Sequence, residues 1–124
     1  MGKREQTRPT ETQEQIALAR VLRRAQLFFT AVPNGGYRLR SEARTLKMMG
    51  VRPGIPDVLV FDVPVGSKAP GLAIELKRVG GVPSDVSKAQ KACLAELKAR
   101  GWLTMVAFGC DDAKQQMRRL GYVV

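Results

Sequence analysis

The chain has 124 residues, with 21 lysines and arginines against 11 aspartates and glutamates and no histidine, so its formal net charge is +10. At this length we expect one domain, and an apolar fraction of 44% is ordinary for a globular core. The absence of histidine excludes histidine general bases and histidine-bound zinc, and two cysteines are too few for a disulfide framework. Any catalysis must therefore use carboxylates, lysine and a hard metal ion, and the surplus charge indicates a polyanionic partner.

The elements in chain order are predicted as helix, strand, helix, strand, strand, helix, strand and helix. Thr10 with Gln13 is typical of a capping box at the first helix, and Ser84 is the expected cap of the long helix that Gly101 ends. The expected ranges are 10–25, 27–32, 41–49, 58–63, 71–77, 84–100, 102–108 and 111–120, with residues 122–124 as an edge strand. This order predicts one α/β domain with a central mixed sheet.

No segment is typical of a membrane or export signal. No apolar run approaches the roughly 20 residues that a membrane-spanning helix needs, and the N-terminus lacks the apolar core of a signal peptide. We therefore expect a soluble cytoplasmic protein. Residues 1–9 are polar and are expected to form a flexible arm, and residues 10–124 to form the single domain.

Two charged residues, Glu75 and Lys77, lie two positions apart in an apolar segment, so their side chains project from the same face of a strand. Burial of such charges is unfavourable unless they find a partner or a metal. If the strand at 58–63 forms a hairpin with the strand at 71–77, the numbers of paired residues sum to 132 or 134. Either register brings Asp57 to the face of Glu75.

Two carboxylates and an ammonium group at one end of a sheet suit Mg²⁺ or Mn²⁺, which prefer oxygen ligands. The backbone carbonyl of Leu76 is placed to join the ligands, and Lys77 would position a water for in-line attack on phosphorus. The alternative is a cross-strand salt bridge of Lys77 with Asp57 or Glu75, which has no catalytic role.

The chain resembles a known family. Gly54-Ile55-Pro56-Asp57 and Ile74-Glu75-Leu76-Lys77 are similar to the PD…(D/E)xK signature of the restriction-endonuclease-like nucleases. Over residues 10–110 the chain more narrowly resembles the stand-alone virus-type replication-repair nuclease (VRR-NUC) domains. The segments that carry this resemblance are 10–15, 32–36, 46–57, 74–78 and 87–90, followed by Leu94, Leu97 and Gly101.

The resemblance implies a restriction-endonuclease-like fold, in which helices flank a central mixed sheet, and a Mg²⁺- or Mn²⁺-dependent endonuclease that acts on DNA. It implies that Asp57 and Glu75 bind the metal directly, that Lys77 is the catalytic lysine, and that Gln90 on a helix orients the site.

The resemblance also implies a metal-binding glutamate on the first helix, where Glu11 and Glu14 are both candidates. Glu11 is favoured because the family's glutamate lies four residues before a glutamine, here Gln15. The alternative for either residue is a solvated acid at the N-terminal end of the helix, where the helix dipole favours negative charge.

A basic segment leads into Asp57. From Tyr37 to Arg52 five basic residues stand against Glu42 alone, so a phosphate backbone bound there is expected to lie beside the metal. The glycines of the preceding loop leave backbone N–H groups open to phosphate. The alternative is a solvated loop and helix face. The candidate DNA contacts are Asn34, Gly35, Gly36, Arg38, Arg44, Lys47 and Arg52.

The leading interpretation is a structure-selective DNA endonuclease, with the four-way (Holliday) junction as the expected substrate. A homodimer is expected because resolving a junction takes two symmetric cuts. One alternative is a restriction-type or nicking nuclease, for which the chain is short. The other is a non-catalytic basic DNA-binding module. A small stand-alone nuclease of this kind is expected to be a phage or prophage protein in a bacterial host.

Overall fold

The structure is a computed structural model that describes residues 8–33 and 40–124. Its elements are α1 (Glu11–Arg24), β1 (Phe29–Ala31), α2 (Arg40–Met48), β2 (Val58–Val60), β3 (Leu72–Lys77), the 3-10 helix η1 (Pro83–Asp85), α3 (Lys88–Ala99), β4 (Leu103–Phe108) and α4 (Cys110–Leu120). In these two ranges no helix combines the length and the hydrophobicity that a membrane span requires.

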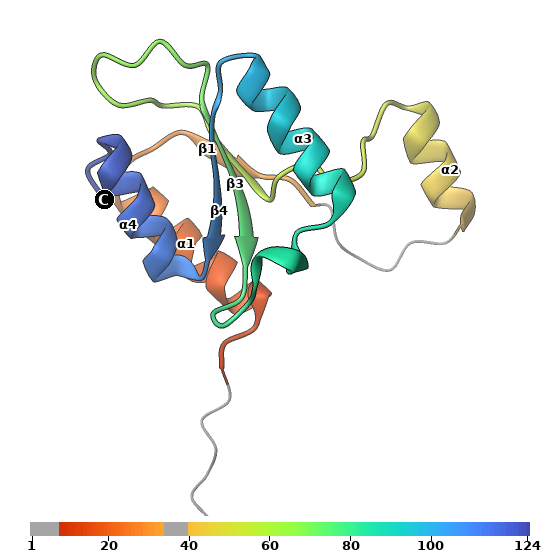
Figure 1. Cartoon of the computed structure of the whole chain (residues 1–124), viewed down its shortest axis with the longest axis horizontal. Helices are drawn as coiled ribbons and strands as arrows, with labels where there is room; N and C mark the ends of the chain where they lie inside the picture. The colour runs from red at the N-terminus through yellow and green to blue at the C-terminus, as the bar shows by residue number, and fades with distance from the viewer. Residues whose placement is uncertain (1–7, 34–39) are drawn as a thin grey trace, which may run out of the picture.

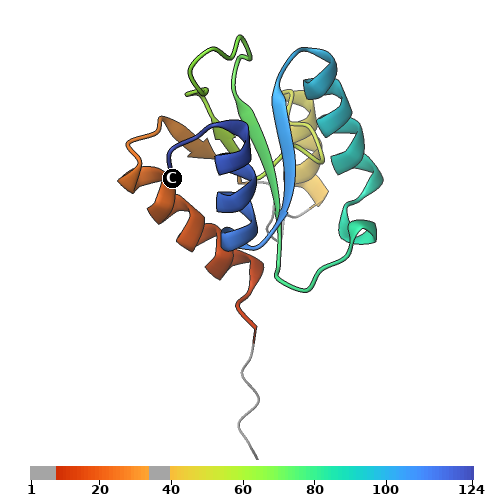
Figure 2. The ribbon, with the colours of Figure 1, turned by 60° about the vertical axis from the view of Figure 1, so that its left-hand side comes forward.

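The four strands form one mixed sheet in the order β1-β2-β3-β4. Strands β1, β2 and β3 are antiparallel neighbours, and β4 runs parallel to β3. Helices α1 and α4 cover one face of the sheet and α3 covers the other, whereas α2 lies away from the sheet (Figures 1 and 2). The predicted class, a mixed sheet flanked by helices, is thereby confirmed.

The core lies between the sheet and the helices α1 and α4. Ile74 and Leu76 of β3 are fully buried in one cluster with Leu18 and Leu22 of α1 and Met117 of α4. Because side chains alternate along a strand, the residues between these two point to the opposite face, toward α3. The charged pair of β3 therefore belongs to the α3 face.

Capping boxes fix the starts of two helices. Thr10 and Gln13 form the predicted box at α1. The expected cap at Ser84 is wrong: Ser84 lies in η1, and α3 begins after Ser87. The reason is that Ser87 has a glutamine three positions later, Gln90, and the two exchange hydrogen bonds of 3.1 and 2.9 Å.

The edge strand expected at residues 122–124 does not form. Gly121 reverses the chain with a φ of +106°, and Tyr122 then packs into the core. Its hydroxyl donates a 2.7 Å hydrogen bond to the Asp62 carbonyl, so this segment is held by the loop after β2 and not by pairing with a strand.

Candidate active site

The hairpin of β2 and β3 adopts one of the two registers that the sequence allowed. The pairs Val58 with Ile74 and Val60 with Leu72 have residue numbers that sum to 132. Continued by one position, this register sets Asp57 opposite Glu75, on the face that α3 covers.

The side chain of Asp57 replaces a backbone hydrogen bond at the end of the β2–β3 pairing. Its Oδ2 accepts a 2.7 Å hydrogen bond from the backbone N–H of Leu76. In the same register the residue opposite Leu76 is Pro56, which has no N–H to donate. The ladder therefore offers the Leu76 carbonyl no donor, and the proline before Asp57 leaves this oxygen for another partner.

The turn before Asp57 is clamped against α3. Gly54 has a φ of +81°, and a Cβ built on it would lie 2.4 Å from the backbone carbon of Ala89. Pro56 is fully buried, and the Cys93 thiol donates to the Pro53 carbonyl at 3.3 Å. Only glycine fits this contact, and the contact fixes Asp57 relative to the first turn of α3.

Helix α3 brings Gln90 to the ammonium group of Lys77. Lys77 Nζ donates to Gln90 Oε1 at 3.0 Å and lies 3.6 Å from Glu75 Oε1. The same glutamine oxygen accepts from the Ser87 N–H in the capping box. Ser87 therefore helps to position Gln90 in the site. The sequence feature that indicates this cap is a serine three positions before a glutamine, and the prediction of Ser84 as the cap missed it.

Glu75 is 1% exposed, and its Oε2 has no hydrogen-bond partner in the described ranges. Burial raises the pKa of Glu75 to about 8, with repulsion from Asp57 as the second cause, and Lys77 opposes this shift. Burial also raises the pKa of Asp57, against the lowering effect of the Leu76 N–H. A buried carboxyl group with an unpartnered oxygen, beside the half-buried Asp57, suits a cation.

The glutamates of α1 do not reach this pair. Glu11 is exposed, and Glu14 is buried, with its Oε2 accepting a 2.6 Å hydrogen bond from the Cys110 N–H. Glu14 thus caps α4, whose N-cap residue Gly109 has no side chain to do so. Consistent with this, no group of three acidic or cysteine side chains gathers as a metal site in the part of the chain that the structure describes.

The candidate DNA contacts are only partly described. Asn34, Gly35, Gly36 and Arg38 lie outside the described residues. Arg44 and Lys47 are exposed on α2, and Arg52 is exposed on the segment between α2 and the Gly54 turn. These three cations precede Asp57 along one continuous stretch of chain.

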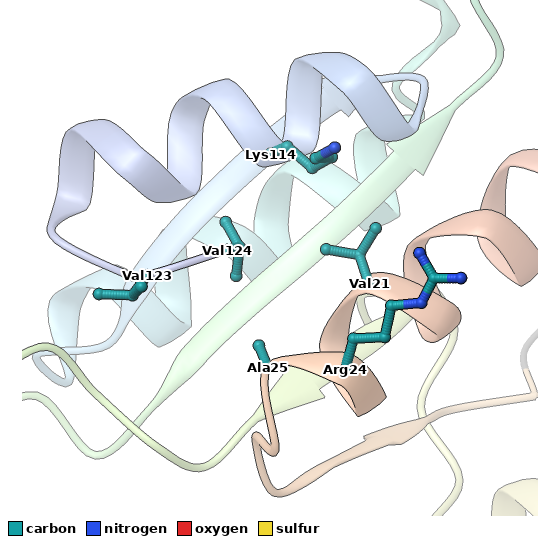
Figure 3. A pocket seen from close by; sticks show the side chains of 6 residues that line it. All are labelled: Val21, Arg24, Ala25, Lys114, Val123 and Val124. Carbon is teal, nitrogen blue, oxygen red and sulfur yellow. The ribbon is translucent and has the colours of Figure 1, made fainter.

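A separate hollow of about 450 Å³ lies on the other side of the sheet, where α1, α4 and the last residues meet (Figure 3). Its lining residues are Val21, Arg24, Ala25, Lys114, Val123 and Val124. The lining is largely apolar, and no aspartate or glutamate side chain is among the residues that line it.

The fold and the site together define a nuclease class. A mixed sheet whose hairpin carries Pro-Asp at the start of one strand and Glu-x-Lys on the next, facing a helix with a glutamine, is the arrangement of restriction-endonuclease-like nucleases that the sequence predicted.

Within that class the chain belongs to the VRR-NUC family, because the VRR-NUC domain profile matches residues 6–110. A solved structure described as a VRR_NUC domain protein is 28% identical and superimposes with a TM-score of 0.72, covering 94% of this chain and 93% of that one. No curated protein matches the chain. The predicted family and fold are therefore confirmed.

Proposed function

We propose that this member of a nuclease family is a metal-dependent endonuclease that hydrolyses phosphodiester bonds in DNA. The observation that carries the proposal is the buried Glu75 oxygen that lacks a partner among the described residues, beside the carboxylate of Asp57. Asp57, Glu75 and the Leu76 carbonyl would hold Mg²⁺ or Mn²⁺, because all three offer oxygen ligands. Such a cation, when bound, supplies Lewis-acid activation of the phosphate.

Lys77 contributes to hydrolysis from a fixed position. Its ammonium group is held by Gln90 and lies beside Glu75, so it stabilises negative charge on the phosphate and orients the attacking water. Gln90 is a positioning residue, since it acts through Lys77.

Charge supports DNA as the substrate. The net charge is +10, and Arg44, Lys47 and Arg52 are exposed on the stretch of chain that leads to Asp57. Cations in this number bind a phosphate backbone in a salt-dependent way. We propose branched DNA, with the four-way junction as the substrate, and a homodimer that makes the two symmetric cuts.

The test compares the wild type with Glu75→Gln on labelled four-way junction, flap and linear duplex, in Mg²⁺, in Mn²⁺ and in EDTA. The matched control is Glu96→Gln, the same chemical change on the exposed face of α3. We expect metal-dependent cleavage by the wild type and the control, and none above background by Glu75→Gln. Calorimetric titration with Mn²⁺ gives a second readout, in which Glu75→Gln alone loses binding.

Two results contradict the proposal. If the wild type binds these DNAs but cuts none of them, the protein is a non-catalytic DNA-binding module and not an endonuclease. Cleavage that survives Glu75→Gln places the chemistry elsewhere. Sedimentation at low concentration tests the homodimer, and a monomer that resolves junctions by paired cuts contradicts that part.

A further inference from the structure

The tip of α2 exposes two methionines. Met48 is 82% exposed and Met49 is 74% exposed, because α2 lies away from the sheet (Figure 1). A helix of nine residues is shorter than the roughly 12–15 residues at which isolated helices become marginally stable in water. Two adjacent exposed apolar side chains at the end of such a helix favour a binding surface at this end.

A Schellman motif holds this tip in a defined shape. Gly50, with a φ of +100°, donates to the Lys47 carbonyl at 3.0 Å, and Val51 donates to the Leu46 carbonyl at 2.9 Å. Leu46 and Val51 both line a hollow of about 430 Å³ beside the Pro53-Gly54 turn. The end of the helix and the Pro53-Gly54 turn thus border the same hollow, and the two methionines lie exposed at the end of the helix.

The charges around the tip favour a polyanion as the partner. Arg44 and Lys47 lie on the same helix and Arg52 follows it, with Glu42 as the acidic residue of α2. A second copy of this chain docked here would bring two sets of these cations together, whereas DNA would neutralise them. Methionine is among the apolar side chains that enter base steps and unstack them.

We propose that Met48 and Met49 form an apolar wedge that enters DNA where base pairs are unstacked, as at the branch of a junction, while Arg44, Lys47 and Arg52 contact the flanking phosphates. This inference rests on the proposed function and specifies how branched DNA is selected. Because the chain continues through the clamped Gly54 turn to Asp57, the wedge sets which phosphate lies near the carboxylate pair.

The test uses a four-way junction with 2-aminopurine at the branch, in EDTA, so that its fluorescence reports unstacking without cleavage. The variant Met48→Gln/Met49→Gln keeps side-chain length and helix propensity, Met48→Leu/Met49→Leu keeps apolarity, and Val65→Gln changes a fully exposed residue of the β2–β3 turn. We expect the wild type, the leucine variant and Val65→Gln to raise the fluorescence. We expect the glutamine variant not to raise it and to bind the junction about tenfold more weakly, a factor equivalent to about 1.4 kcal/mol, with unchanged affinity for linear duplex.

Unstacking by the glutamine variant equal to that of the wild type overturns the wedge. A wild-type dimer that the glutamine pair converts to a monomer in sedimentation, with no change in fluorescence, makes the tip a self-association surface and also overturns it. The proposed nuclease can fail separately: if the wild type unstacks the branch but cuts nothing in Mg²⁺ or Mn²⁺, the wedge stands and the endonuclease does not. If the wild type cuts junctions without any rise in fluorescence, the endonuclease stands and the wedge does not.

Discussion

Replacing Glu75 by glutamine should stabilise the metal-free protein increasingly as the pH rises. Burial, together with repulsion from Asp57, raises the pKa of Glu75 from 4.5 to about 8. Below pH 4.5 the carboxyl is protonated in both the folded and the unfolded chain, so its ionisation does not affect stability. Between 4.5 and about 8 the unfolded chain releases this proton while the folded chain keeps it, so the folded state loses stability as the pH rises.

The size of the effect follows from the pKa difference. Each pH unit in that window changes the free energy of unfolding by up to about 1.4 kcal/mol, so the loss between about pH 5 and about pH 8 is on the order of 4 kcal/mol. Glutamine cannot ionise and does not incur this loss. At low pH the variant should be no more stable than the wild type, because the carboxyl is then neutral as well and glutamine offers Lys77 a similar neutral oxygen.

The assay is urea denaturation in EDTA at several pH values, with Glu96→Gln as the exposed control. We expect the stability of Glu75→Gln relative to the wild type to increase with pH, and that of the control to stay constant. In Mn²⁺ the order should reverse, since a cation bound by ionised Glu75 stabilises only the wild type. A difference that is independent of pH in EDTA would refute the reasoning, because Glu75 would then be ionised at neutral pH in the folded protein.

Two further predictions concern residues that hold the site and the fold. Gly54→Ala should lower the free energy of unfolding by about 2–4 kcal/mol, because the new Cβ is strained at positive φ and lies 2.4 Å from the backbone of Ala89. The control is Gly66→Ala, at a similar φ but with open space around it, so chemical denaturation of both variants isolates the contact with Ala89. Equal losses in the two variants would contradict that contact. Glu14→Ala should lower the free energy of unfolding by about 1–3 kcal/mol, because the Cys110 N–H loses its acceptor. The control Glu11→Ala, at an exposed glutamate of the same helix, should change stability little. Equal thermal stability of the two variants would contradict the cap.

The hairpin could be predicted from the sequence because it depends on local patterns. The alternation around Glu75 and Lys77 defines a face, and a turn centred near Gly66 and Ser67 restricts the register to two choices that both place Asp57 there. The C-terminal segment could not be predicted in this way. Tyr122 is held by a hydrogen bond to Asp62, which is 60 residues away in sequence, and apolar character alone does not distinguish such a contact from strand pairing.

The first-helix glutamates show where neither resemblance nor helix geometry separates two neighbouring candidates. The family pattern favours Glu11, but Glu14 lies four positions and Glu11 seven positions before Leu18, so helical periodicity places both on the side of Leu18. Periodicity alone therefore does not predict that Glu14 is buried while Glu11 is exposed. Nor does it predict the partner of Glu14, because the Cys110 N–H comes from the other end of the chain. A metal-binding role for either glutamate stays a prediction.

The residues around Lys77 serve the fold and the site at the same time. One oxygen of Gln90 accepts from the Ser87 N–H, which starts α3, and from the Lys77 ammonium group, which the proposed reaction needs. The first turn of α3 is in turn pressed against Gly54, which fixes the direction of Asp57. Because a helix cap that loosens also releases the glutamine, a change at Ser87 would displace Lys77 without touching it. The site is therefore as rigid as the first turn of α3, and that turn begins after Ser87, three residues later than the predicted cap at Ser84.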